Sequence, residues 1–236
     1  MGDLFMSREE VQMKPAGELL RGEMLPGSYP GVSIFKNILK AKKKYDVTTY
    51  SETQKSQIFF FAKGKGYVGT EHGAHNITEE AVFVPLFNSE KIFIYAVTDL
   101  EFLEILVDLT PEDVANMKKA RMTLPHFSLM SNCMRYEEDF KGPGMISYGI
   151  IRNRFLGRSS MGAVIADGPN VNGEHSHSNI EQWYYGLEGT CFTYKASGKT
   201  FTVKDGDLTY TTKTVPHASE TGAGQKIRYV WFELMS

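Results

Sequence analysis

The stretch from His175 to Gly189 reads HSHSNIEQWYYGLEG, and it decides the fold expected for this 236-residue chain. His175 and His177 are two positions apart, so in an extended strand both imidazoles point to the same side. Two neutral imidazoles on one side can bind the same metal ion. Gln182 then opens an aromatic run that ends at a turn glycine, which is typical of a buried strand. The stretch therefore predicts a β-structure with a metal site at its edge.

A second histidine motif follows further along the chain, with the spacing Gly206-x5-Thr212-x-Thr214-x2-His217-x3-Thr221. The two patterns together resemble those of the cupin superfamily, Gly-x5-His-x-His-x3-4-Glu-x6-Gly and Gly-x5-Pro-x-Gly-x2-His-x3-Asn. In that family, the two histidines and the glutamate of the first motif and the histidine of the second coordinate a metal inside a small β-barrel. The resemblance implies that His175, His177 and His217 are metal ligands.

Departures from the family pattern leave the fourth ligand open. Gln182 occupies the glutamate position if the six-residue spacing to Gly189 is kept, whereas Glu181 fits the shorter spacing from His177. We favour Gln182, because the strand between the ligand and the turn glycine is the more rigid of the two segments. Threonines replace the usual proline, glycine and asparagine of the second motif, so that motif depends on its glycine and histidine alone.

The same layout occurs in the first half of the chain. Gln57-Ile-Phe-Phe-Phe-Ala-Lys-Gly64 repeats the polar residue, aromatic strand and turn glycine at an offset of 125 positions from Gln182. Such self-similarity indicates duplication of one β-domain. We therefore predict an all-β chain of two fused cupin barrels, the double-stranded β-helix or jelly-roll fold. A degenerate barrel is expected over residues 20–109 and a metal-binding barrel over residues 120–236.

Thr110-Pro111-Glu112-Asp113 interrupts the β-pattern between the two expected barrels. A threonine cap, proline at the first helical position and acidic residues in the first turn together form a helix start signal. The sequence therefore predicts a short linking helix that begins at this point.

The N-terminal barrel lacks histidines at the equivalent positions. If Gln57 is aligned with Gln182, Tyr50 and Glu52 replace the histidine pair and the second-motif histidine falls near Glu90. This favours a structural barrel without a metal. An oxygen-rich cluster of Glu52, Gln57 and Glu90 is the alternative.

Three imidazoles and one oxygen ligand leave open positions on an octahedral ion, which is typical of a catalytic site. We expect one divalent transition metal, from among iron, manganese, nickel, cobalt and zinc. With the neutral Gln182 as fourth ligand the ion keeps its full charge as a Lewis acid. This favours non-redox isomerase or lyase chemistry on a small keto acid, hydroxy acid or sugar-like substrate. Tyr184, Tyr210 and Glu181 are the candidate catalytic groups for proton transfer.

Two other functions remain open at this level. The first is an iron- or manganese-dependent dioxygenase or an enzyme similar to oxalate decarboxylase, which Glu181 as a ligand would favour. The second is a small-molecule-binding protein without turnover, because a fold does not determine function. Four arginines lie on strands of the same barrel, and one that faces inward would pair with a substrate carboxylate; these are Arg152, Arg154, Arg158 and Arg228.

The composition limits the kinds of partner that we expect for the chain. A net charge of -2 with both signs interspersed argues against nucleic acid or an anionic membrane. No apolar run is long enough to cross a bilayer, and Cys133 and Cys191 follow no disulfide pattern. We expect a cytoplasmic protein with a small-molecule substrate. Residues 13–32 are the expected contact of a homodimer.

Overall fold

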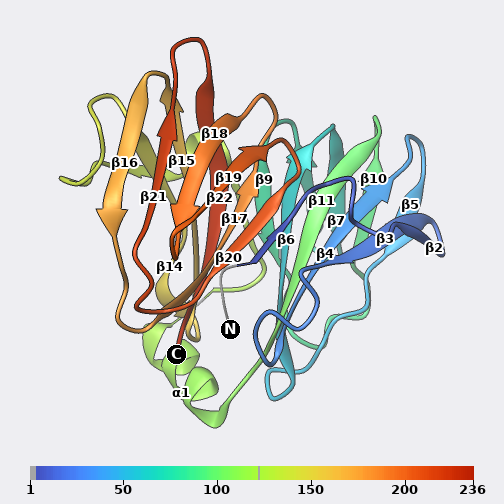
Figure 1. Cartoon of the computed structure of the whole chain (residues 1–236). Helices are drawn as coiled ribbons and strands as arrows, with labels where there is room; N and C mark the ends of the chain where they lie inside the picture. Colours follow the sequence, from blue (N-terminus) through green and yellow to red (C-terminus); the bar gives the residue numbers. More distant parts are fainter. Residues whose placement is uncertain (1–3, 122) are drawn as a thin grey trace. The chain divides into compact units, whose positions relative to one another are not determined.

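The computed structural model describes residues 4–121 and 123–236, and strands dominate it (Figure 1). The described chain divides into two compact units. We call Val11–Cys133 the N-terminal barrel, and residues 4–10 together with Met134–Ser236 the C-terminal barrel. Within the described residues each barrel contains one seven-stranded and one four-stranded antiparallel sheet. The predicted all-β architecture of two barrels is confirmed. The short helix expected to link them, Pro111–Ala120, lies within the N-terminal barrel.

The elements of the N-terminal barrel are β2 (Lys14–Ala16), β3 (Leu19–Met24), β4 (Val32–Leu39), β5 (Lys44–Asp46), β6 (Lys55–Lys63), β7 (Gly66–Thr70), β8 (Gly73–Ile77), β9 (Ala81–Val84), β10 (Phe93–Ala96), β11 (Leu100–Asp108), α1 (Pro111–Ala120), β12 (His126–Leu129) and the 3-10 helix η1 (Met130–Asn132). The order of the larger sheet is β12-β9-β6-β11-β4-β3-β2, and that of the smaller is β5-β10-β7-β8.

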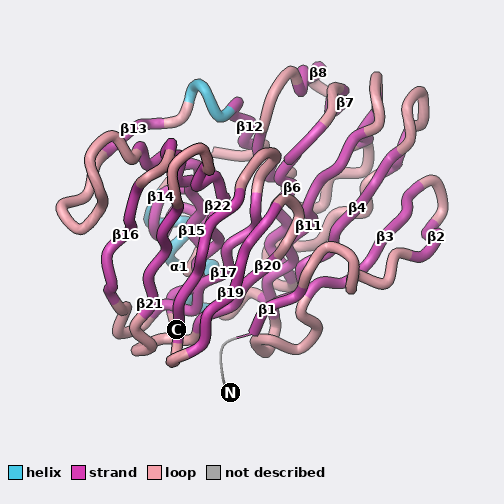
Figure 2. The backbone as a smooth tube through the Cα atoms, turned by 45° about the horizontal axis from the view of Figure 1, so that its top comes forward, coloured by secondary structure: helices cyan, strands magenta, loops and turns pink. Residues whose placement is uncertain are grey.

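The elements of the C-terminal barrel are β1 (Leu4–Met6), β13 (Met134–Tyr136), β14 (Ile146–Leu156), β15 (Ser159–Asp167), β16 (Asn170–His175), β17 (Ile180–Gly186), β18 (Cys191–Ala196), β19 (Lys199–Lys204), β20 (Leu208–Thr211), β21 (His217–Thr221) and β22 (Lys226–Met235). The larger sheet has the order β1-β20-β17-β22-β15-β14-β13, and the smaller has the order β16-β21-β18-β19. The backbone trace of Figure 2 shows the loops that join these strands.

The two aromatic strands of the repeat are β6 and β17. Each lies inside the larger sheet of its barrel, β6 between β9 and β11 and β17 between β20 and β22. Nearly every residue of both strands is buried. An inner strand that is covered on both faces has a continuous run of hydrophobic residues. This explains why these two strands gave the clearest sign of an internal repeat.

The predicted helix α1 begins where its capping signal lies. The Thr110 hydroxyl accepts a hydrogen bond from the Asp113 backbone N–H at 3.2 Å, and the Asp113 carboxylate accepts the Thr110 N–H at 2.9 Å. This reciprocal pair satisfies two of the N–H groups that a helix start leaves without intrahelical partners. None of the helices in the described part of the chain is long and apolar enough to cross a membrane.

The first described residues belong to the C-terminal barrel. Strand β1 pairs with β20, and the Phe5 ring stacks on Phe201 at a centroid distance of 5.3 Å. The backbone N–H of Arg8 donates to the Asp207 carboxylate at 2.9 Å. No local pattern indicates this pairing, because it joins segments 199 positions apart.

Candidate metal centre

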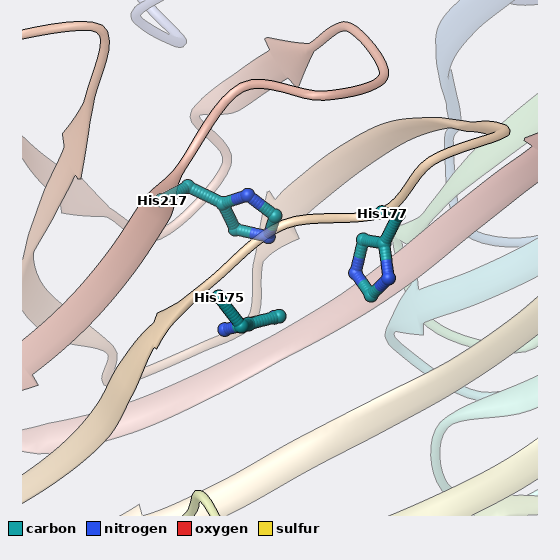
Figure 3. Close-up of side chains that lie close together, drawn as sticks. All are labelled: His175, His177 and His217. Atoms are coloured by element: carbon teal, nitrogen blue, oxygen red, sulfur yellow. The ribbon is translucent and has the colours of Figure 1, made fainter.

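Three histidines meet on the smaller sheet of the C-terminal barrel (Figure 3). His175 is the last residue of β16, His217 is the first of β21, and the two are direct partners in the strand ladder. His177 follows two residues after β16. One ring nitrogen from each lies within 4.8 Å of the others, and no other cluster of this kind occurs among the described residues. The structure therefore brings the three predicted histidine ligands together.

Backbone carbonyls orient two of the imidazoles. The Nδ1 atom of His175 lies 2.8 Å from the Gly173 oxygen, and Nδ1 of His217 lies 3.0 Å from the Val215 oxygen. Because a carbonyl only accepts, Nδ1 carries the proton and the lone pair is on Nε2. The buried Nε2 atoms of His177 and His217 have no protein partner. This is the arrangement of histidines that bind a metal, so the residues fit a divalent transition ion.

The protonation of the cluster is set by burial. Burial is the main cause that lowers the pKa of His175 and His177, and it lowers the pKa of His217 to about 4. The other two imidazoles contribute to this lowering of the His217 pKa, because like charges would repel. All three rings are therefore neutral near pH 7, which is the form that a metal requires.

A cavity of about 380 Å³ opens beside the histidines. Part of its wall is the larger sheet, in which β22 pairs with β17 on one side and β15 on the other. Rows of paired residues cross these strands, among them Gln182–Glu233–Ser160 and Tyr184–Trp231–Gly162. A Cβ at Gly162 would lie 2.2 Å from the Trp231 ring, so only glycine leaves room for this indole. His175, His177 and Gln182 all line the cavity.

Gln182 and Glu181 lie in different surroundings, because successive strand residues point to opposite faces. Gln182 donates from Nε2 to Glu233 Oε1 at 2.6 Å, and its buried Oε1 has no protein partner. Glu181 is buried and accepts a hydrogen bond from the Tyr210 hydroxyl at 2.5 Å. Neither Glu181 nor Tyr210 lines the cavity. The catalytic role suggested for these two residues stays a prediction that no contact with the cavity supports.

Tyr184, the third candidate catalytic residue, lines the cavity. Its ring stacks on Tyr229 at a centroid distance of 4.3 Å, and Asn172 Nδ2 donates to the Tyr229 hydroxyl at 3.2 Å. Burial raises the pKa of Tyr184 well above its usual value. The hydroxyl therefore stays protonated and is able to donate a hydrogen bond.

Sequence reasoning missed Glu233, although a signal was present. Glu233 is the only carboxylate in the hydrophobic strand β22, and it lies on the same face as the cavity residues Tyr229 and Trp231. Burial is the main cause that raises the pKa of Glu233 to about 7. A lone acid in a largely hydrophobic strand was thus the sign of a functional position that the sequence contained.

A second missed group comes from the segment between β13 and β14. The Lys141 ammonium is almost fully buried, pairs with the Glu138 carboxylate and donates to Ser147 Oγ at 2.6 Å. The Phe140 ring lies 4.5 Å from the His175 ring, centroid to centroid. Glu138, Phe140 and Lys141 line the cavity, whereas Ser147 does not. No motif marked this segment in the sequence.

Of the four candidate arginines, Arg152 lines the cavity, whereas Arg228 donates to the Glu188 carbonyl at 2.7 Å. In the N-terminal barrel, Glu52 pairs with Lys118 at 3.8 Å, Gln57 donates to Glu104, and Glu90 lines a separate cavity. The oxygen-rich cluster left open for that barrel therefore does not form.

Comparisons with known proteins agree with this geometry. The family model of the cupin domain matches residues 163–233, a range that includes all three histidines. No curated protein sequence matches the chain.

Solved structures match over almost the whole chain. Protein Ylba from E. coli is 11% identical with a TM-score of 0.77, over 99% of this chain and 90% of that one. A putative glyoxylate-induced protein from Pseudomonas aeruginosa is 12% identical with a TM-score of 0.77, over 98% and 88%. Oxalate decarboxylase from Lactobacillus farciminis is 14% identical with a TM-score of 0.72, over 98% and 86%. At these identities the similarity shows the fold alone. The C-terminal barrel therefore contains a cupin domain, and the chain as a whole has the fold of these solved structures.

Proposed function

We propose that the C-terminal barrel binds one divalent transition metal and that the chain is a metal-dependent enzyme for a small oxygen-rich substrate. The proposed ligands are Nε2 of His175, His177 and His217 together with Oε1 of Gln182. The observation that carries the proposal is the cluster of three neutral imidazoles beside a cavity of about 380 Å³. A cavity of this size suits a small organic acid rather than a polymer.

The ligand set favours non-redox chemistry of the isomerase or lyase class. When bound, a divalent ion with only neutral protein ligands acts as a Lewis acid toward a carbonyl or carboxylate oxygen. The chain supplies the remaining functions. Tyr184 is the proposed hydrogen-bond donor to the substrate, and Arg152 is the proposed partner of a substrate carboxylate. The side chains of Phe140 and Trp231 line the cavity and add aromatic surface to it.

The alternative is a redox enzyme similar to oxalate decarboxylase. Glu233 favours it, since a buried carboxyl in the cavity is able to hold a proton during decarboxylation. Solved oxalate decarboxylases share the fold, which is compatible with both alternatives.

Metal analysis of untagged protein tests the proposal. We expect about one equivalent of metal in the parent, and its loss in the variants His177→Ala and Gln182→Ala. His72→Ala is the matched control, because His72 is an exposed histidine of the N-terminal barrel. A parent that stays free of metal after incubation with Mn²⁺, Fe²⁺, Co²⁺, Ni²⁺ or Zn²⁺ would sink the proposal.

A substrate screen separates the two kinds of chemistry. Keto acids, hydroxy acids and sugars are incubated with the metal-loaded protein under air and under nitrogen. Turnover that is equal in both atmospheres, without release of carbon dioxide, supports the isomerase or lyase. Consumption of dioxygen or release of carbon dioxide favours the redox alternative.

A further inference from the structure

A carboxylate holds the side chain of Gln182 in one orientation. Glu233 lies directly across from Gln182 in the ladder of β17 and β22, and directly across from Ser160 in the ladder of β22 and β15. Its Oε1 accepts from Gln182 Nε2 at 2.6 Å, and its Oε2 accepts from Ser160 Oγ at 3.4 Å. Each carboxylate oxygen of Glu233 therefore has a hydrogen-bond donor.

This contact decides which end of the amide remains available. The oxygen and nitrogen ends of a glutamine side chain have nearly the same shape, but only the NH₂ group donates, and here it donates to Glu233 Oε1. With the NH₂ group directed to Glu233, the carbonyl oxygen of Gln182 is the free end, and it is buried without a protein partner. A buried acceptor of this kind is stabilised by a cation.

We infer that Glu233 is a positioning residue of the metal centre: it fixes the amide of Gln182 so that the oxygen, not the nitrogen, is presented as a ligand. The inference rests on the proposed function. The two oxygens of a carboxylate ligand are equivalent, so either one can bind the metal. A glutamine amide has two different ends, so it replaces a carboxylate only if the oxygen end is held toward the metal. Outer hydrogen bonds that orient metal ligands have this role in many metal sites.

The N-terminal barrel provides a matched pair for comparison. There, Gln57 Nε2 donates to Glu104 Oε1 at the same distance of 2.6 Å, but Glu104 also forms an ion pair with Arg21. Among the described residues no lysine or arginine pairs with Glu233, which accepts from Gln182 and Ser160. Glu104 is therefore a natural control, because it holds a glutamine without a histidine cluster beside it.

The test measures Co²⁺ affinity by calorimetry and the visible absorption spectrum of bound Co²⁺, without any activity assay. We expect Glu233→Leu to weaken Co²⁺ binding about 10- to 100-fold, the usual effect of losing an orienting partner, and to shift the Co²⁺ bands. Glu233→Gln should restore affinity to within a few-fold, because its side-chain oxygen still accepts from Gln182. Glu104→Gln should leave affinity and spectrum unchanged.

A double variant distinguishes orientation from general damage to the fold. In a Gln182→Glu background the ligand is a carboxylate and needs no orienting partner, so adding Glu233→Leu should not weaken Co²⁺ binding further. Glu233→Ala takes the place of the leucine variant if the leucine variant does not fold, as judged by circular dichroism of the metal-free protein.

Three results would overturn the inference alone, with the parent still binding Co²⁺. The first is parental affinity in Glu233→Leu. The second is an equal loss in Glu233→Gln and Glu233→Leu, which would mean that charge matters and orientation does not. The third is an undiminished loss in the Gln182→Glu background. A parent that binds no Co²⁺ would instead overturn the proposed function, and this inference with it.

Discussion

The two barrels hold the same glutamine-to-carboxylate hydrogen bond in different surroundings. Gln57 donates to Glu104 and Gln182 donates to Glu233, both at 2.6 Å. In the N-terminal barrel the guanidinium of Arg21 pairs with the carboxylate. In the C-terminal barrel the same kind of pair lines the cavity beside the histidines. Both amide oxygens are buried without a hydrogen-bond partner. The two pairs differ in the cation on the N-terminal carboxylate and in the cavity and histidines beside the C-terminal amide.

The aromatic residues differ in the same way. Phe59, Phe61 and Phe102 pack in the core of the N-terminal barrel, with the Phe102 ring 5.5 to 6.0 Å from the other two, centroid to centroid. In the C-terminal barrel the buried rings beside the histidines carry hydroxyls, as in Tyr184 and Tyr229. Phenylalanine needs no hydrogen-bond partner when buried, whereas tyrosine does. One copy of the duplicated fold therefore has an apolar core at the place where the other has a polar site.

Metal removal should give the largest effect and should be confined to one barrel. At a metal concentration of 1,000 times Kd, binding stabilises the folded state by about 4 kcal/mol. Hydrogen exchange with and without a chelator should therefore change protection in β16, β17 and β21 but leave β6 and β11 unaffected. Equal loss of protection in both barrels would contradict the difference drawn between them.

Replacement of Arg21, the cation that pairs with Glu104, should give the next largest effect. Arg21→Leu leaves the buried Glu104 carboxylate without its ion pair, so we expect a loss of about 3 kcal/mol in the free energy of unfolding with no change in metal affinity. Chemical denaturation measures the free energy of unfolding, and calorimetry measures the metal affinity. As a control, Arg8→Ala removes a more exposed ion pair with Asp205 and should cost less than about 1 kcal/mol.

The histidine cluster should make the metal-free protein sensitive to acid. The pKa of His217 is about 4 when folded and near 6.5 when unfolded, so between these values the unfolded chain binds more protons. Stability is therefore lost as the pH falls from about 6.5 to 4, by on the order of 2 kcal/mol. Denaturation curves at pH 7 and pH 5 measure this loss. The variant His217→Asn should show a smaller pH dependence, and an unchanged dependence would show that other groups cause it.

Removal of one hydroxyl from the polar interior should give the smallest effect. Tyr229→Phe takes the acceptor away from Asn172 Nδ2 and should destabilise the protein by about 1 kcal/mol. Tyr67→Phe in the N-terminal barrel is the matched control, since Tyr67 packs on Phe93 and Tyr95 through its ring and should tolerate the change within about 0.5 kcal/mol. Thermal unfolding compares the two. A larger loss of stability in Tyr67→Phe than in Tyr229→Phe would contradict this prediction.

The sequence by itself determined the duplicated β-fold, the start of helix α1 and the three histidines. Each depends on short spacings. Residues two apart in a strand share a face, a capping motif lies within four positions, and an aromatic strand ends at its own turn glycine. Such rules are local, so the His175–His177 spacing and the Thr110 cap were recognisable without knowledge of the sheet order, although the strand ends at His175 and His177 lies two residues beyond it. The sequence alone did not decide between Gln182 and Glu181. Strand alternation places the two side chains on opposite faces but does not say which face points inward.

Only the tertiary structure decided the partners of these residues. Glu233 reaches Gln182 from 51 positions away, and Glu104 reaches Arg21 from 83 positions away. Glu138 and Lys141 come from a segment with no motif. Such contacts are set by strand order and pairing register, and a register shift of one residue would turn every side chain of a strand to the opposite face. The three proposed histidine ligands were therefore found from their spacing and its resemblance to the cupin motifs, whereas the groups around them depend on the assembled sheets.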